Sequence, residues 1–240
     1  MAKSADGRPM KREWLQGIYE TSATRREHLG ALRIDDIGRK FRYAKAGAVA
    51  LAAGYPQISL APVANHSALT PSVAAAIGDT TVYITLGGTA ATADYYEDGY
   101  LVVAAGTGIG HMYRIDSNEA QTATAGVVTI HLAEPIRVAW LVADTKIDLV
   151  NSIFRSLVVS TAVTDFVAGV SVTVVPINHY FWIQTGGPAP CIATTEAHGT
   201  QLAAGAAVGI EITAWTDNIL GPIFGTGNTG DAGLVALKID

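Results

Sequence analysis

The chain has 240 residues, which is enough for one large domain or two small ones, and about half of it is apolar. Its net charge of −5 is uneven: residues 1–45 carry eleven Lys and Arg against six acids, whereas residues 46–240 carry five against fifteen. A single cysteine, Cys191, excludes an intramolecular disulfide and a multi-cysteine metal site. The N-terminal residues lack the apolar core of a secretory signal, and no stretch reaches about 18 apolar residues. We therefore expect a protein made in a soluble setting, without a membrane-spanning helix.

Charge is sparse after the N-terminal segment, because only twenty of residues 46–240 are charged. A monomer that covers its own surface usually carries a higher charge density. Together with the abundant Ala, Val, Thr and Gly, this indicates a surface that is largely buried against partners. The alternative is a compact domain with a polar Thr, Ser and Gln surface.

Residues 1–40 are expected to form an extended N-terminal arm. Within it, Trp14, Leu15, Ile18 and Tyr19 fall at positions i, i+1, i+4 and i+5, which predicts a short helix with one apolar side. The residues around this helix are polar and charged. The arm is either a frayed terminus or a segment whose aromatic residues dock on a neighbouring chain.

Strand patterns dominate from residue 41 onward. A strand is predicted at Phe41–Ala44, followed by a helical turn or irregular crossing that ends at Gly54, and prolines keep residues 55–72 extended. Thr80–Leu86 alternates between apolar and polar residues, as expected for a half-buried strand. Further strands are predicted at Gly99–Ala104, His111–Ile115, Val127–Leu132, Ile136–Val142, Arg155–Ser160, Val170–Val175, His179–Thr185, Ala189–Thr194, Val208–Ala214 and Leu234–Ile239. Gly186-Gly187-Pro188 predicts a tight turn that makes Ala189–Thr194 pair back as a hairpin.

Short strands separated by glycine-containing turns, without strand–helix–strand alternation, predict an all-β fold with a β-sandwich or barrel-like body. Residues 75–140 and 150–215 share a similar rhythm, which suggests two β subdomains. We place them at 41–146 and 147–240, after the arm at 1–40.

The most aromatic stretch is His179–Thr185, in which Tyr180 and Trp182 share one face of the strand and Phe181 shares the other with Ile183. If Tyr180 and Trp182 are exposed, they are suited to anchoring a protein interface or to binding a sugar. The alternative is that both faces are buried between two sheets. The residues predicted to form an interface are Trp14, Tyr19, Phe41, Tyr43, Tyr180 and Trp182.

Three segments carry a resemblance to a known group of proteins. They are Ile37–Gly54 (IGRKFRYAKAGAVALAAG), Asp98–Val103 (DGYLVV) with Tyr113–Ile115 (YRI), and Tyr180–Pro188 (YFWIQTGGP). In this order, over residues 37–195 and the terminal strand, the chain resembles structural proteins of tailed bacteriophages and is similar to capsid decoration, or cement, proteins.

The resemblance implies a virion protein on the capsid exterior, made in the host cytoplasm. It implies the major capsid protein as partner and a homo-oligomer, with a trimer favoured. It brings no catalytic residues with it. A tail, neck or fibre-associated component is the alternative within the virion, and a glycan-binding receptor protein that uses Trp182 or Trp215 is the alternative of another class.

Motifs for catalysis and cofactor binding are weak. Gly225–Gly230 matches G-x-G-x-x-G, but a strand rather than a helix is predicted after it, so we interpret it as a turn. The acid pairs Asp35-Asp36 and Glu97-Asp98 have turn composition, unlike two carboxylates held across a cleft. Cys191 has no basic neighbour that would lower its pKa. The histidines form no H-x-H or H-x-x-x-H pair; they are His28, His66, His111, His131, His179 and His198.

We therefore expect a non-enzymatic protein with no cofactor and no metal, although a triad assembled from distant parts of the chain stays open. The basic segments Arg25-Arg26 and Arg39–Arg42 are interleaved with acids. Because nucleic-acid affinity comes from unopposed cations, an acidic protein groove is a better partner for them than DNA.

Overall fold

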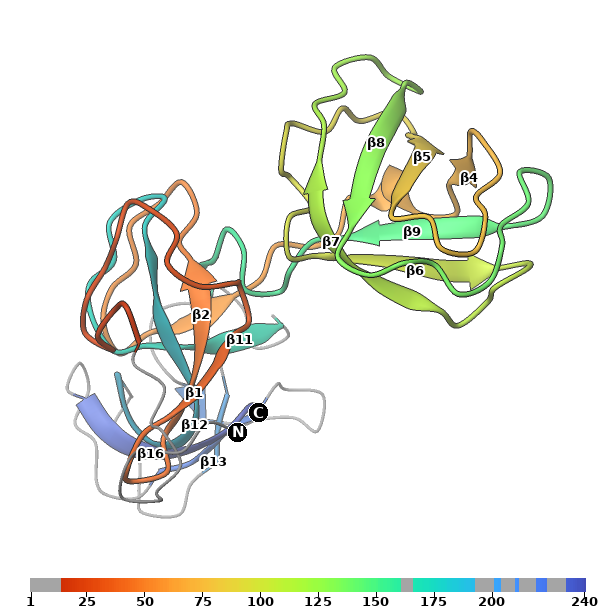
Figure 1. Ribbon diagram of the computed structural model, residues 1–240. Coiled ribbons are helices and arrows are strands. Elements are labelled where there is room, and N and C mark those ends of the chain that lie inside the picture. Colours follow the sequence, from red (N-terminus) through yellow and green to blue (C-terminus); the bar gives the residue numbers. More distant parts are fainter. Residues whose placement is uncertain (1–13, 161–165, 193–200, 204–209, 212–218, 224–231) are drawn as a thin grey trace, which may run out of the picture. The chain divides into compact units, whose positions relative to one another are not determined.

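The computed structural model describes residues 14–160, 166–192, 201–203, 210–211, 219–223 and 232–240. Apart from one 3₁₀ turn, η1 (Ala64–His66), the elements in these residues are β-strands (Figure 1), which confirms the predicted all-β class. The predicted helix at Trp14–Tyr19 is wrong, because this segment forms bends and turns. Of its apolar residues, Trp14 packs against Trp182 of the sheet described below, whereas Leu15 and Tyr19 are exposed.

The chain divides into two compact units: a barrel unit, residues 58–157, and a sheet unit made of residues 1–57 and 158–240. The division differs from the predicted boundaries after residues 40 and 146. The physical reason is strand pairing between distant segments. β3 (Pro56–Ile58) and β10 (Val158–Val159) are neighbours in one sheet, so the chain leaves the sheet unit on one strand and returns on the adjacent one.

The sheet unit is built around β12 (Tyr180–Ile192), the longest strand. Its main sheet has the order β1-β2-β12-β11-β3-β10, with β16 also paired to β12, and a small sheet has the order β14-β13-β15. The remaining strands of this unit are β1 (Leu32–Ile34), β2 (Lys40–Lys45), β11 (Val167–Ser171), β13 (Gln201–Ala203), β14 (Ile210–Glu211), β15 (Ile219–Pro222) and β16 (Ala232–Lys238). Because β1 pairs with β2, part of the predicted arm belongs to the sheet.

β12 runs through the predicted Gly186-Gly187-Pro188 turn, so the predicted hairpin at this point is wrong. The first half of β12 pairs with β2, a bulge follows between Gln184 and Gly186, and the second half pairs with β16. Gly187 has a positive φ of 79°, a conformation that suits glycine. Glycine and proline are typical of turns but also occur at bulges and sheet edges, and for this reason the predicted turn was wrong.

The barrel unit is a curled antiparallel sheet of order β4-β5-β8-β7-β6-β9. Backbone hydrogen bonds in both directions between Leu69 and Ile147, at 2.8 and 2.9 Å, join the region before β4 to β9 and close the sheet on itself. Alternate side chains of the strands fill the interior with Val, Ile, Leu and Tyr, together with Trp140. The strands are β4 (Thr70–Pro71), β5 (Thr81–Thr85), β6 (Tyr100–Ala105), β7 (Met112–Asn118), β8 (Val127–Leu132) and β9 (Lys146–Val150).

The antiparallel order places three connections at one end of the barrel: residues 72–80, 106–111 and 133–145. We call this the three-loop end; the chain enters and leaves the barrel at the other end (Figure 1). The predicted strand Ile136–Val142 is wrong, because this stretch lies in the third loop. Only an isolated bridge between Trp140 and Ala75 is formed there.

The close approach of backbone at the start of β6 predicts a strict requirement for glycine. A Cβ at Gly99 would lie 2.4 Å from the carbonyl oxygen of Val150 and 2.8 Å from that of Tyr96. Backbone atoms cannot move aside without disturbing the strand pairing. We therefore expect Gly99→Ala to lower the free energy of unfolding by about 1–3 kcal/mol in urea denaturation. Gly88→Ala is the control, because its Cβ would meet only the Asn65 side chain, at 3.1 Å. Equal stability of the two variants would contradict the requirement for glycine at position 99.

Candidate functional site

Four of the aromatic residues predicted to form an interface lie on one face of the sheet unit. Phe41 and Tyr43 of β2 share this face with Tyr180 and Trp182 of β12, since Tyr43 is the register partner of Trp182. Trp14, from the N-terminal segment, packs edge-on against Trp182 with ring centroids 4.9 Å apart. The structure thus brings together five of the six predicted residues.

The rings contact one another in geometries that favour aromatic pairs. Tyr43 meets Trp182 edge-on at 5.1 Å and stacks on Tyr180 at 5.9 Å. The Arg33 guanidinium carbon lies 5.8 Å from the Trp14 ring centroid and 5.5 Å from that of Trp182. Burial lowers the pKa of Arg33 from its ordinary value, against the opposing effect of nearby acids. Arg33 remains a cation at neutral pH and contributes cation–π attraction to both indoles.

Gln16 connects this aromatic cluster to the N-terminal segment. Its side chain accepts a hydrogen bond from the Tyr43 hydroxyl at 2.8 Å and donates one to the Tyr180 carbonyl at 2.9 Å. Its backbone carbonyl accepts from Trp182 Nε1 at 3.0 Å and from Arg33 Nη1 at 2.8 Å. Gln16 is only 3% exposed, so these bonds are shielded from water. This role could not be predicted from the sequence, because a single glutamine carries no signal of it.

The aromatic cluster therefore binds the protein's own N-terminal segment. Phe41, Tyr43 and Trp182 are fully buried and cannot serve as exposed anchors for another chain in this conformation. Trp14 and Tyr180 are half-buried. Tyr19, the sixth predicted residue, is 61% exposed, and Arg39 donates a hydrogen bond to its hydroxyl at 3.3 Å.

Three acids of the two predicted pairs, Asp35, Glu97 and Asp98, each pair with a different arginine. Asp35 forms an ion pair with Arg39 at 2.6 Å. Although burial raises the pKa of Asp35, hydrogen bonds from Arg39 outweigh this effect and leave the pKa below its ordinary value. Asp98 is buried and pairs with Arg114 at 3.1 Å, whereas Glu97 faces a different arginine.

The histidines are dispersed. In the part of the chain that the structure describes, no three His, Cys, Asp or Glu side chains are grouped as metal ligands would be. His66 is buried, with Nδ1 bonded to the Tyr96 hydroxyl and Nε2 2.7 Å from the carbonyl of Thr89, which assigns the ring proton to Nε2. His198 and the Gly225–Gly230 motif lie outside the described residues.

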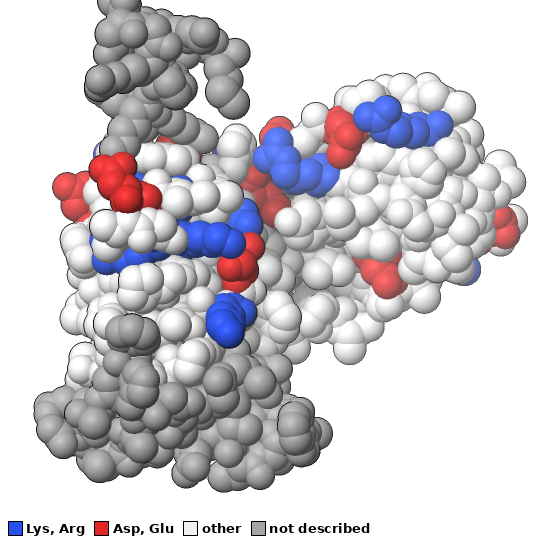
Figure 2. Space-filling model, turned by 90° about the horizontal axis from the view of Figure 1, so that it is seen from below, with Lys and Arg blue, Asp and Glu red and all other residues white. Residues whose placement is uncertain are grey.

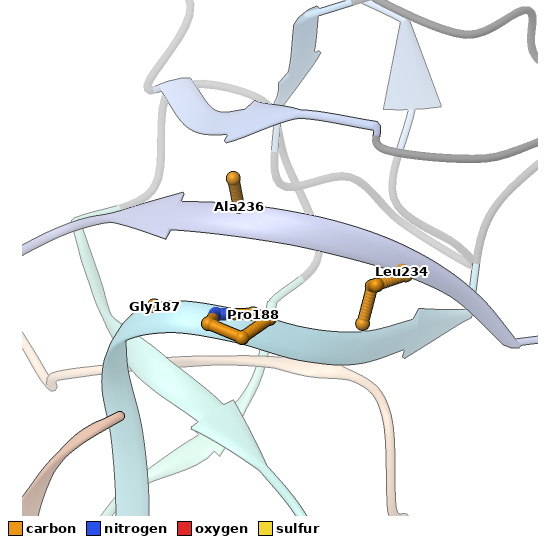
Figure 3. A pocket seen from close by; sticks show the side chains of 4 residues that line it. All are labelled: Gly187, Pro188, Leu234 and Ala236. Atoms are coloured by element: carbon orange, nitrogen blue, oxygen red, sulfur yellow. The ribbon is translucent and has the colours of Figure 1, made fainter. Parts of the chain in front are cut away.

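An apolar hollow of about 350 Å³ lies beside β12 and β16 (Figure 3). Its described lining consists of Gly187 and Pro188 on β12 and Leu234 and Ala236 on β16. None of these four residues has a titratable or hydrogen-bonding side chain. They therefore offer apolar contact and no reactive group.

The loops at the three-loop end of the barrel carry exposed aliphatic side chains. None of these residues was among those predicted to form an interface. Leu141 and Val142 were assigned to a strand, whose apolar residues are normally expected to face a core. In the structure both are exposed. The signal in the sequence that could have indicated this exposure is the position of apolar residues close to the turn residues Gly78 and Asp144.

No family model, curated protein or solved structure matches this chain. Among the described residues, no helix has the length and apolar character required to cross a bilayer. The fold and the site define an all-β protein whose aromatic residues fasten its own N-terminal segment.

Removal of the Gln16 side chain should loosen the N-terminal segment. We expect Gln16→Ala to lower the free energy of unfolding by about 2–3 kcal/mol, because it leaves the buried Tyr43 hydroxyl without this acceptor. Hydrogen exchange of residues 14–30 should become faster. Leu15→Ala is the matched control: Leu15 is 74% exposed, and its loss should change stability by no more than about 0.5 kcal/mol. Unchanged exchange in Gln16→Ala would show that the segment is held by other contacts.

Cys191 should be unreactive in the folded protein. Burial raises the pKa of its thiol to about 12, so the nucleophilic thiolate is scarce at neutral pH. We expect iodoacetamide at about pH 8 to label the denatured chain fully and the native chain at least about a hundredfold more slowly. Mass spectrometry gives the labelled fraction. Comparable rates in the native and denatured protein would contradict the burial of this thiol.

Proposed function

We propose that this chain is a non-enzymatic structural protein of a tailed-bacteriophage particle, which decorates the outside of the capsid. Its partners are the major capsid protein and further copies of itself, with a trimer favoured. The sequence resemblance over residues 37–195 supplies the class of particle. The exposed apolar surface supplies the adhesive mechanism.

The observation that carries the proposal is the combination of sparse charge and many exposed aliphatic side chains. Nineteen large apolar residues are exposed among those that the structure describes. Figure 2 shows one face on which most of the described surface carries neither sign of charge. Single exposed apolar residues are ordinary, but grouped ones usually mark an interaction surface. Repeated over a lattice, such contacts would add interface energy at every site.

A structural role also fits the surroundings of the groups that could be reactive. Cys191 is buried, His66 is bonded on both ring nitrogens, and Asp35 and Asp98 are paired with arginines. Each of these groups stabilises the fold, and none of them is arranged beside another as a nucleophile with a base.

The alternatives differ in what supports them. A tail, neck or fibre-associated role would use the same adhesive surface, and copy number separates it from decoration. The glycan-binding alternative depended on an exposed Trp182, which is buried in the aromatic cluster, and on Trp215, which lies outside the described residues. No described residue favours it.

Purified particles test the proposal. We expect this protein in them at a copy number comparable to that of the major capsid protein, measured by gel densitometry with the capsid band as internal standard. Cryo-electron microscopy should show it on the outer surface of the head. A few copies per particle would indicate the tail or neck instead. Its absence from particles, with the protein present in the infected-cell lysate, would overturn the proposal.

A further inference from the structure

The three loops at one end of the barrel unit are joined into one platform. The first and third loops are linked by the bridge between Ala75 and Trp140. The second and third are linked by Asp144, whose Oδ2 accepts hydrogen bonds from the backbone N–H and the hydroxyl of Thr107 at 2.6 and 2.7 Å. Thr145 adds a bond from its hydroxyl to the Thr107 carbonyl at 3.1 Å. The side chains on these loops therefore keep a defined arrangement.

The platform carries exposed aliphatic side chains. All three loops contribute exposed side chains: Val73 (57% exposed), Ile77 (69%), Ile109 (66%), Leu141 (52%) and Val142 (41%). Burying such side chains against a partner is favourable by about 25 cal/mol per Å² of apolar surface removed from water. Grouped exposed apolar residues usually mark an interaction surface, and these five lie on loops that are linked to one another.

The same loops carry both signs of charge. The Arg137 side chain is 69% exposed, and its nearest acid, Glu134, is 3.6 Å away and itself 45% exposed. Asp79 and Asp144 each use one carboxylate oxygen, Oδ2, for the hydrogen bonds that the described residues make to them. Their Oδ1 atoms, and most of the Arg137 donors, remain open to a partner.

We propose that the three-loop end is the contact between copies of this chain. Protein interfaces combine buried apolar side chains with polar and charged ones. Because these loops hold a cation and acids together, their charges complement themselves: Arg137 of one copy can pair with Asp79 or Asp144 of a second. A partner with one sign of charge would match only part of these charges. The inference rests on the proposed function, because that function includes a homo-oligomer of this chain.

Sedimentation velocity of the full chain over a range of concentrations tests the inference. We expect the double variant Ile77→Gln/Leu141→Gln to raise the dissociation constant by roughly tenfold or more, which corresponds to about 1.4 kcal/mol. The matched control is Ile37→Gln/Val174→Gln, which removes equally exposed aliphatic residues, 70% and 65%, from the sheet unit. This control should associate like the wild type. Circular dichroism checks that both double variants fold.

A wild-type chain that stays monomeric at every concentration would overturn the inference. So would a double variant that associates as tightly as the wild type, because copies would then meet elsewhere. The particle experiment is independent of this one. Self-association through the three-loop end by a protein absent from particles would remove the proposed function and leave the inference standing. Monomers attached to particles would support the proposed function and overturn the inference.

Discussion

The sheet unit depends on β12, which is hydrogen-bonded to different partners along its length. Its first half lies between β2 and β11, and its second half pairs with β16 from the C-terminal part of the chain. Because these segments are far apart in sequence, the unit forms only when both halves of β12 find their partners. The bulge before Gly186 re-aims the strand between them. The barrel unit is inserted into this arrangement between β3 and β10 and carries its own core.

The same strand explains why the most aromatic part of the chain is not its adhesive surface. Register pairing places Tyr180 and Trp182 beside the aromatic residues of β2. The N-terminal segment then covers that face through Trp14 and Gln16. Large rings that would anchor a partner if exposed are used inside the subunit, where they stabilise the sheet. Much of the exposed apolar surface consists instead of smaller aliphatic residues, and five of these lie on the three loops at one end of the barrel.

The two units therefore contribute different properties to the proposed adhesive role. The sheet unit fastens the basic N-terminal segment, where Arg33 is engaged with two indole rings. The barrel unit supplies a filled core and an end with grouped aliphatic side chains. A closed barrel has few free strand edges, so its interactions are made by side chains and loops rather than by strand addition. Such a surface suits an assembly protein, which must bind specific neighbours without polymerising through its sheets.

The sequence by itself determined the all-β class and several strands, because alternation of apolar and polar residues is a local signal. Val127–Leu132 was predicted with the bounds that it has in the structure, and the terminal strand at Leu234 was found nearly as closely. Local signals failed where pairing is non-local. The glycine–proline turn signal at Gly187 lies on a continuous strand just after a bulge, and the predicted subdomain boundaries followed strand rhythm rather than contacts.

Only the tertiary structure decided which apolar residues are buried. Six aromatic residues were predicted from the sequence to form an interface, and the rings of four of them do meet: Trp14, Tyr43, Tyr180 and Trp182. Whether that contact lies within one chain or between chains depends on what covers the sheet, and no periodicity encodes this. The aliphatic end of the barrel could not be predicted from the sequence for the same reason. Its residues come from three separate loops that only barrel closure brings together.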